Sequence, residues 1–413
     1  MKKRIIENIN SPGDLEKLYR ENSSEFSSAF NQISEDYDSE LVSFWKIRLA
    51  PVKENEFKGF LKLDLFVLLG LSLLTALLIK IPLIFTQISE DSFFMRNLAI
   101  VVFNGIILFA FWQNKIAEKK WIYGYAACML LLVSFINLLP TIKGDSVVLA
   151  FIHIPLFLWC IFGLVYVSFD FKNYIRRIEF IRFNGELLIM TGLILLAGGL
   201  LTAITLGLFT AIKMNIEKFY IEYVAFSGAV AAPMVALYLV KLYPTITNKI
   251  APVIARVFTP IVLLTLAVYL ISLVFSKSNI QEDRELLILF NIMLLAVTAI
   301  IVFSLSELSK SDKSFNVLML FALALLAIVI NAIALFAIIT RLTEGFTPNR
   351  TVVLISNVLI FVNLVQIALN LLQVYFTGKP LRQVEVAVAK YLPVYFAWTL
   401  IVIFVLPFVF GMK

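Results

Sequence analysis

Carboxamide side chains form the densest polar set within the apolar part of this sequence. Asn363, Gln366 and Asn370 follow one another at i, i+3 and i+7, and Gln373 extends the series. In a helix this spacing places them on one face, and a bilayer would force that face toward other helices. Asn331, in the preceding apolar segment, is expected to meet it. Carboxamides bind ions or sugars but cannot exchange protons at physiological pH, so two interpretations stay open: a polar cavity, or interhelical hydrogen bonds that only fix packing.

A second polar cluster lies in the short connection that follows the apolar segment 315–340. Gly345 is expected to end the helix before it, and Thr347 to cap the helix after it. Arg341 and Glu344 have the i, i+3 spacing of an ion pair. Arg350 would then be available to an anionic headgroup or solute. The alternative is a well-capped helical hairpin that binds no ligand.

Arg256 is the third candidate, because it lies between Pro252 and Pro260. Prolines interrupt the helical hydrogen-bond ladder, and freed backbone groups beside a permanent positive charge would suit an anionic ligand. Alternatively, the Arg256 side chain extends to the cytoplasmic membrane surface. Pro233 interrupts the neighbouring apolar segment, so this pair of segments is expected to form an interrupted or mobile element.

The remaining chemistry-bearing residues argue against most catalytic and cofactor classes. The chain has two cysteines, Cys128 and Cys160, and a single histidine, His153. These cannot form a disulfide framework or a cysteine- and histidine-based metal centre. The sequence contains neither a Walker-type phosphate loop nor a dinucleotide-binding glycine motif. No grouping of histidine and carboxylates is poised for acid–base work, so we expect no cofactor and no metal, and we consider an enzyme the weakest hypothesis.

The elements that must position these residues are membrane-spanning helices. Of the 413 residues, 61% are hydrophobic and 15% are charged, whereas a soluble chain would have roughly a quarter charged. The apolar residues occur in blocks long enough to cross a bilayer. We therefore predict an all-α, polytopic transmembrane bundle over residues 61–413, with about eleven spans. Their approximate bounds are 62–86, 94–112, 121–140, 147–169, 186–212, 219–240, 251–276, 285–306, 315–340, 350–376 and 389–411.

The distribution of positive charge predicts how these spans are oriented. Lysine and arginine gather in the N-terminal tail and in every second loop, for example at Lys172, Arg176 and Arg177. The alternate loops carry fewer, such as Arg96. By the positive-inside rule the N-terminus is cytoplasmic and the C-terminus extracytoplasmic. The net charge of +7 is explained in this way, without a nucleic-acid partner.

Small residues in the segment 186–212 predict a close helix contact. Gly199, Ala203 and Gly207 recur at every fourth position, a pattern that lets two transmembrane helices approach closely. No internal repeat is visible in the chain.

Residues 1–60 differ from the rest because they are polar, with aromatic residues at helical spacing. Ser11 is expected to cap one short helix, and Asn22 with Glu25 has the spacing of a second cap. A third apolar stripe contains Trp45. We predict two or three amphipathic helices in a cytosolic tail. This tail either forms a cap, on the membrane surface or on the cytoplasmic loops, or binds a cytosolic protein partner.

Two sequence phrases resemble a known family. Arg341, Gly345, Thr347 and Arg350 form the frame R-x-x-x-G-x-T-x-x-R after an apolar helix. This frame resembles a family of bacterial multi-pass inner-membrane proteins catalogued as a domain of unknown function, and the phrase 14–20 is similar to members from Bacteroidetes-type bacteria. The resemblance implies a helical fold in a bacterial inner membrane. It implies no catalytic residue, substrate or cofactor.

Three hypotheses for function follow. The first is a transporter or channel-like protein for a small polar or anionic solute, with a cavity between the segments 315–340 and 350–376 and a gate in 219–240 and 251–276. The second is a membrane scaffold or sensor whose tail binds a partner. The third is a membrane enzyme that acts on lipid or glycan headgroups.

Overall fold

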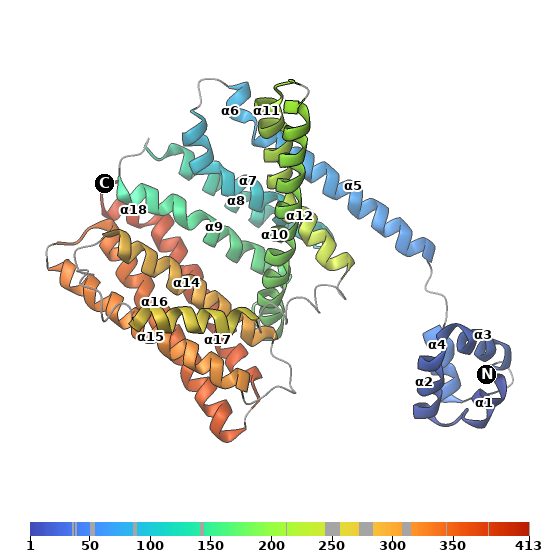
Figure 1. The fold of residues 1–413 in the computed structure, drawn as a ribbon. Coiled ribbons are helices and arrows are strands. Elements are labelled where there is room, and N and C mark those ends of the chain that lie inside the picture. The colour runs from blue at the N-terminus through green and yellow to red at the C-terminus, as the bar shows by residue number, and fades with distance from the viewer. Residues whose placement is uncertain are drawn as a thin grey trace. The chain divides into compact units, whose positions relative to one another are not determined.

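The fold is described from a computed structural model of the chain. It describes residues 1–34, 37, 39–49, 54–85, 89–140, 144–211, 213–243, 257–271, 284–307, 315–343, 345–378 and 380–412. The chain divides into two units, Met1–Phe66 and Val67–Lys413, which we call the N-terminal unit and the membrane unit. The regular elements in both are helices (Figure 1), as the predicted fold class requires.

The N-terminal unit has four short helices before α5, where two or three were predicted: α1 (Lys2–Glu7), α2 (Pro12–Glu21), α3 (Ser23–Ile33) and α4 (Glu40–Leu49). Asn22 caps α3 as predicted, because its side-chain oxygen accepts a hydrogen bond from the Glu25 amide at 3.1 Å. Ser11 precedes α2, but its hydroxyl donates to the Asp14 carboxylate at 2.7 Å and no backbone amide donates to it. The apolar stripes of all four helices meet in one core, formed by Ile5, Ile9, Leu15, Leu18, Phe26, Ala29, Phe30, Ile33, Val42 and Trp45.

The helix α5 (Glu54–Leu78) continues into the membrane unit, which contains most of the chain. The further helices are α6 (Ile81–Ile84), α7 (Glu90–Gln113), α8 (Lys119–Leu138), α9 (Asp145–Tyr166), α10 (Tyr174–Ala211), α11 (Glu217–Phe219), η1 (Tyr220–Ala225), α12 (Phe226–Leu242), α14 (Arg284–Glu307), α15 (Phe315–Leu342), α16 (Pro348–Thr377), α17 (Arg382–Phe404) and α18 (Leu406–Val409). A further helix covers Val257–Ile271.

The helix lengths and compositions confirm an integral membrane protein. Within the described ranges, 8 helices are long and apolar enough to cross a bilayer: α7, α8, α9, α10, η1 with its flanking helices, α15, α16 and α17. Shorter apolar helices cover Leu63–Leu78, Val257–Ile271 and Met293–Leu305. Each of these helices overlaps one of the predicted spans. The total of eleven remains a prediction.

The membrane unit contains two groups of helices, each with its own core. In the first helix group, α7 packs against α8, α9 and α12, and α5 contributes Leu68 to the shared core. In the second helix group, α15 packs against α14 and α16, α16 packs against α17, and the helix Val257–Ile271 contributes Leu266. The groups meet where α9 packs on α17, and α10 contacts both. A stacked pair of rings, Phe157 and Phe396, with centroids 5.7 Å apart, joins α9 to α17.

The segment 219–240, which was predicted to be interrupted at Pro233, is irregular at an earlier position. Pro233 lies inside α12, which continues past it. The irregular part is η1, a π-helical turn over Tyr220–Ala225. Here the backbone carbonyl of Glu222 accepts a hydrogen bond from the Lys80 ammonium, which also lies 4.6 Å from the centroid of the Tyr223 ring. A π-turn leaves backbone groups without their usual helical partners, so Lys80 stabilises the turn.

The close helix contact is found at Gly105 and not at the small residues predicted in the segment 186–212. A Cβ atom added at Gly199 or Gly207 would meet no described atom within 4 Å. At Gly105 of α7 it would lie 2.6 Å from the Met234 sulfur and 2.8 Å from the Thr75 Cγ2. Thr75 and Met234 are both buried, so neither has room to move away.

We expect Gly105→Ala to destabilise the membrane unit by about 1–3 kcal/mol, because an extra methyl group overpacks a filled helix contact. The matched control is Gly199→Ala, which adds the same methyl group to another transmembrane helix where no described atom is near. It should leave stability unchanged or raise it by up to about 1 kcal/mol, since alanine favours helix over glycine. The free energy of unfolding of both variants in one lipid composition checks this. Equal stability of the two variants would contradict it.

Candidate functional site

A cavity of about 1130 Å³ lies between the two helix groups of the membrane unit. One side is formed by α9 and α10, and the other by α14, α15, α16, α17 and the helix Val257–Ile271. The predicted position, between α15 and α16, gives only part of the wall: both helices line the cavity, but they pack directly against each other along a shared apolar core. The cavity instead follows the boundary between the groups.

Much of the cavity wall is apolar. Leu188 of α10 is 74% exposed, Ile152 of α9 is 60% exposed and Leu295 of α14 is 48% exposed, and all three line the cavity. Apolar side chains that are exposed along a cavity offer contacts to the apolar part of a ligand. The cavity therefore presents an apolar surface beside its polar groups.

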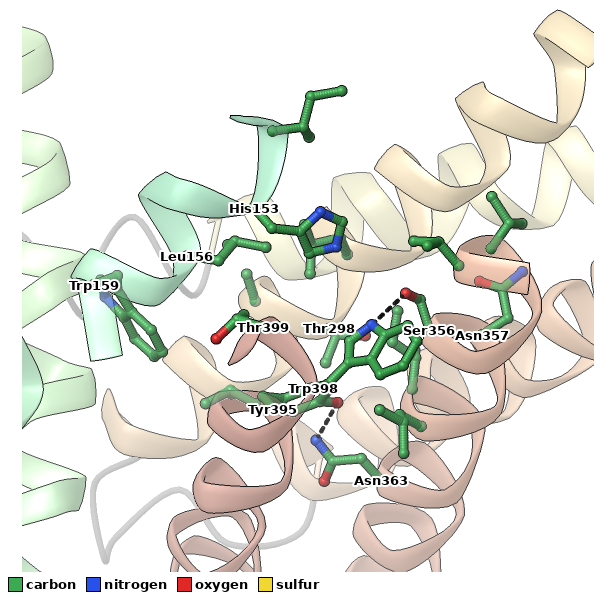
Figure 2. A pocket seen from close by; sticks show the side chains of 18 of the residues that line it. His153, Leu156, Trp159, Thr298, Ser356, Asn357, Asn363, Tyr395, Trp398 and Thr399 are labelled. Carbon is green, nitrogen blue, oxygen red and sulfur yellow. Dashed lines mark hydrogen bonds between the residues drawn. The ribbon is translucent and has the colours of Figure 1, made fainter. Parts of the chain in front are cut away.

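A set of polar side chains, which we call the polar band, also lines the cavity. It consists of His153, Ser356, Asn357, Asn363, Tyr395 and Trp398. Figure 2 shows the two hydrogen bonds that order it: the Asn363 amide donates to the Tyr395 hydroxyl at 2.9 Å, and the Trp398 indole donates to the Ser356 hydroxyl at 2.9 Å. Both bonds join α16 to α17, so they hold these side chains beside the cavity.

His153 adds a ring nitrogen to the polar band. Its Nδ1 lies 2.8 Å from the backbone oxygen of Leu149. A carbonyl oxygen only accepts hydrogen bonds, so Nδ1 carries the proton of the neutral ring. The other nitrogen, Nε2, then presents a lone pair. His153 thus acts as an acceptor in the cavity.

The predicted hinge forms one end of the cavity, which we call the rim: Asp145, Arg341, Thr347, Asn349 and Arg350. Thr347 caps α16 as predicted, with its hydroxyl accepting from the Arg350 amide at 3.3 Å. Gly345 follows the end of α15 with φ of 120°, a conformation that favours glycine. The Arg350 guanidinium donates to the Gly345 carbonyl at 3.0 Å, and the Asn349 side chain donates to Asp145 at the start of α9. The hinge is therefore tied to the opposite helix group.

The structure separates the predicted carboxamide set. Asn363 is buried and lines the cavity. Asn331 is fully buried between α15 and α16, where it donates to the Asn357 carbonyl at 3.1 Å, so its interhelical contact is to Asn357 and not to the stripe. Gln366 is exposed, and Asn370 is half-buried and donates to the Gln366 carbonyl at 2.7 Å. Neither lines the cavity.

The predicted anion contacts have different outcomes. Arg341 and Arg350 both lie at the rim. Glu344 and Arg256 lie outside the residues that the structure describes, so the predicted Arg341–Glu344 pair and the anion site at Arg256 remain predictions.

Sequence reasoning missed the contribution of α17. Tyr391, Tyr395 and Trp398 lie at i, i+4 and i+7, and all three side chains hydrogen-bond to α16; the Tyr391 hydroxyl donates to the Leu359 carbonyl at 2.8 Å. Aromatic side chains with one polar atom at helical spacing could have signalled this face. The sequence also did not predict that His153, the single histidine, lines the same cavity as residues of α16.

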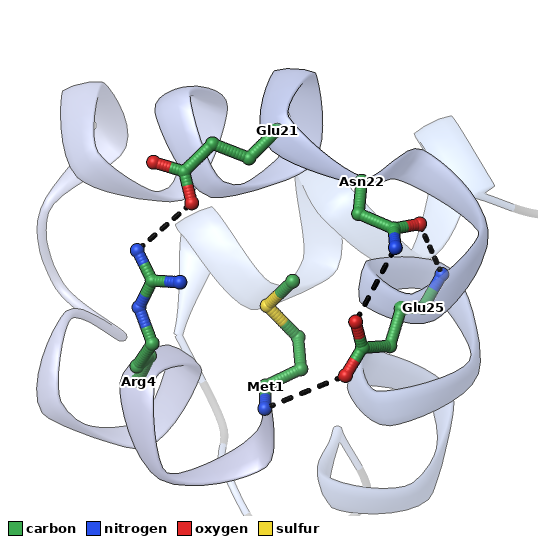
Figure 3. Close-up of polar contacts among 5 residues, drawn as sticks. All are labelled: Met1, Arg4, Glu21, Asn22 and Glu25. Carbon is green, nitrogen blue, oxygen red and sulfur yellow. Dashed lines mark hydrogen bonds and ion pairs between the residues drawn. The ribbon is translucent and has the colours of Figure 1, made fainter.

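Polar contacts in the N-terminal unit fasten its helices to each other (Figure 3). Arg4 of α1 pairs with Glu21 of α2 at 2.9 Å, and the Met1 amino group pairs with Glu25 of α3 at 3.7 Å. Because Asn22 caps α3 and also donates to the Glu25 carboxylate at 3.3 Å, the two residues form a reciprocal cap. These charged groups therefore stabilise the packing of α1, α2 and α3 within the N-terminal unit.

Glu16 of α2 connects this helix to α4. It accepts hydrogen bonds from Arg20 at 3.0 Å and pairs with Arg48 of α4 at 2.8 Å. The Arg20 hydrogen bond, followed by Arg48, lowers the pKa of Glu16 below its usual range. Arg48 also lies 4.6 Å from the Trp45 ring centroid, so one arginine connects the surface ion pair to the aromatic core.

Comparison of the chain with family models, curated proteins and solved structures finds no match. The resemblance carried by Arg341, Gly345, Thr347 and Arg350 therefore stays a prediction. Function has to be argued from the cavity itself.

Proposed function

We propose that this protein is a transporter-like membrane protein that binds a small polar or anionic solute in the cavity between its two helix groups. One observation carries the proposal: a cavity of about 1130 Å³ lies at the boundary of two helix groups, which are joined through α9 and α17, and contains the polar band. Small changes in how two rigid groups meet can expose such a site alternately to either side of a membrane.

The polar band supports this proposal because polar side chains within the hydrocarbon layer raise the free energy of the protein unless they hydrogen-bond to other helices or to a ligand. His153 is eight residues after Asp145 along α9, so the band lies roughly 12 Å from the rim at about 1.5 Å per residue. Asn363 lies further along α16 in the same direction. The band thus extends toward the middle of the predicted span, where lipid offers no hydrogen bonds.

We further propose a bacterial inner membrane, with the N-terminus in the cytoplasm and the C-terminus outside it. The charge bias of the loops supports this orientation, and the resemblance of the hinge motif supports the bacterial assignment. In this orientation the rim faces the extracytoplasmic side.

The two alternative hypotheses receive less support. A scaffold was favoured by apolar stripes on the tail, but those stripes pack into the core of the N-terminal unit. An enzyme would need a carboxylate or a second basic group beside His153, and no charged residue belongs to the polar band. The cavity remains the best-supported site.

The test is to label a cysteine placed at Ser356, in a background with Cys128→Ser and Cys160→Ala. We expect a membrane-impermeant methanethiosulfonate reagent to modify this cysteine in both right-side-out and inverted vesicles, because alternating access opens the cavity to each side in turn. Ala324→Cys is the matched control, since Ala324 is fully buried in the second helix group and outside the cavity. Labelling at Ser356 should exceed that at Ala324 at least about tenfold.

Two results would overturn the proposal. Labelling no faster at Ser356 than at Ala324, from either side, would mean that water never enters the cavity. Labelling from one side alone, under every condition tried, would indicate a closed-ended binding pocket and no transport.

A further inference from the structure

Three side-chain atoms of the polar band have no hydrogen-bond partner among the described residues. They are Nδ2 and Oδ1 of Asn357 and Oδ1 of Asn363. The two residues are 0% and 2% exposed. Buried polar atoms in proteins nearly always have a partner, and those without one need an explanation. Both residues lie in the cavity wall, so rotation of their side chains toward the cavity would let a bound ligand supply the missing hydrogen bonds.

The types of these atoms indicate which ligand fits. Acceptors are offered by Asn357 Oδ1, Asn363 Oδ1 and His153 Nε2. Donors are offered by Asn357 Nδ2 and by the Tyr395 hydroxyl, whose oxygen already accepts from Asn363. A hydroxyl group both donates and accepts. Several hydroxyls close together would therefore match this mixture of donors and acceptors.

The charges near the cavity argue against an ionic headgroup in the polar band. The charged residues among its described lining are Asp145, Arg341 and Arg350, all at the rim. An anion bound at the band would meet three acceptors and no cationic side chain there. A cation would meet no carboxylate. Burying either ion without a partner in this environment would be costly.

The apolar part of the cavity wall suits a hydrocarbon chain. Leu156, Leu188 and Ile189 belong to it, and Leu188 is 74% exposed. A chain attached to a hydroxylated headgroup could run along this wall and into the lipid. The headgroup would stay at the polar band.

From this arrangement we infer that the ligand is an amphiphile whose headgroup is uncharged and carries several hydroxyl groups, as in a sugar or polyol joined to a hydrocarbon chain. This inference rests on the proposed function, because it assumes that the cavity binds a ligand. It narrows the polar or anionic solute to one chemical class.

The test uses the full-length protein in lipid nanodiscs and tritiated octyl β-D-glucoside below its micellar concentration, with binding to empty nanodiscs subtracted. Unlabelled octyl glucoside, octyl phosphate, octyltrimethylammonium and glucose compete for the site. We expect octyl glucoside to displace the label at a concentration at least about tenfold below that of either charged amphiphile, because hydrogen bonds to its hydroxyls are worth about that factor. Glucose, which has no chain, should need a still higher concentration.

Variants connect the binding to the polar band. Asn363→Leu and Tyr395→Phe should each weaken octyl glucoside binding about tenfold, through loss of hydrogen bonds. Asn370→Leu is the matched control, because it makes the same change on the same helix outside the cavity, and it should bind as the unmodified protein does. If Asn363→Leu fails to accumulate in membranes, Tyr395→Phe carries the test, because it keeps the ring and removes only the hydroxyl.

The outcomes separate this inference from the proposed function. No saturable binding of any amphiphile or of glucose would count against the cavity as a binding site, and so against both. Saturable binding with equal or better competition by a charged amphiphile would overturn the headgroup class and leave the proposed function standing. Glucose competing as well as octyl glucoside would overturn the need for a chain. Unchanged binding in Tyr395→Phe would exclude the polar band as the recognition site.

Discussion

Trp45→Ala will unfold the N-terminal unit and leave the membrane unit folded. Trp45 is 1% exposed and is the largest side chain of the core, with its ring centroid 4.9 Å from that of Phe26 and 5.4 Å from that of Tyr19. Truncating a buried tryptophan to alanine costs about 3–5 kcal/mol. A single core in a unit this small rarely supplies more than about 3–5 kcal/mol. The loss therefore equals the whole stability of the unit.

Amide hydrogen exchange of the full-length protein in nanodiscs reports the folding of the N-terminal unit and of the membrane unit separately. In Trp45→Ala, amides of α1 to α4 should exchange at the rate of an unfolded chain, while those of α7, α9 and α16 keep their protection. Phe44→Ala is the matched control: Phe44 is the adjacent aromatic residue but is 54% exposed, so protection should persist. Retained protection of α1 to α4 in Trp45→Ala would show that their core does not depend on this ring.

The second large effect is expected at Arg96, which lies in α7 and is only 8% exposed. Its guanidinium donates to the backbone carbonyls of Asn137 at 3.1 Å and Pro140 at 3.3 Å. The Asn137 carbonyl belongs to the last turn of α8 and the Pro140 carbonyl lies just beyond it, where helix geometry leaves carbonyls without partners. Arg96 also lies over the Phe151 ring, 5.6 Å from its centroid. One side chain therefore joins α7, the end of α8 and α9.

We expect Arg96→Met to destabilise the membrane unit by about 1–3 kcal/mol, because two part-buried hydrogen bonds from a charged donor are lost. The stability of Arg96→Lys should lie between that of the unmodified protein and that of Arg96→Met. The lysine ammonium keeps the charge, but it lacks the planar guanidinium that can donate to two carbonyls at once. The free energy of unfolding in a fixed lipid composition gives both values. A Met variant as stable as the unmodified protein would mean that water or lipid headgroups satisfy these carbonyls equally well.

Features encoded by neighbouring residues were predictable from the sequence. The cap at Thr347 and the reciprocal cap of Asn22 and Glu25 depend on contacts three residues apart, and both are found. The all-α membrane class follows from the length of the apolar blocks, and it too is confirmed. Local hydrogen-bond chemistry and burial in lipid act on each segment separately, so no knowledge of its neighbours is needed.

Contacts between distant segments were not predictable in this way. The i, i+3, i+7 spacing correctly placed Asn363, Gln366 and Asn370 near one face of α16, but the cavity ends before Asn370, which is seven residues or about 10 Å further along the helix. Where a cavity ends depends on which helix covers the next turn. Arg96 illustrates the same limit: its charge suggested a loop, whereas it is buried in α7 and donates to carbonyls at the end of α8.

The same limit applies to the tail. The apolar stripes around Leu15, Phe26 and Trp45 were predicted correctly as helix faces, yet nothing local indicated that they would pack against one another. The structure joins them in one core with a fourth helix, α1, which contributes Ile5. A stripe that covers a membrane surface and a stripe that fills a small core have the same periodicity.

The apolar wall of the cavity changes what sets its occupancy. An amphiphile that reaches Leu188 and Ile152 from the bilayer has first dissolved there, so the relevant concentration is its mole fraction in the lipid. Each additional methylene group favours the lipid phase by about 0.8 kcal/mol, which multiplies that mole fraction roughly fourfold at the same aqueous concentration. Weak contacts at the band would then suffice for a long-chain compound, and apparent affinities in water would track its partition coefficient.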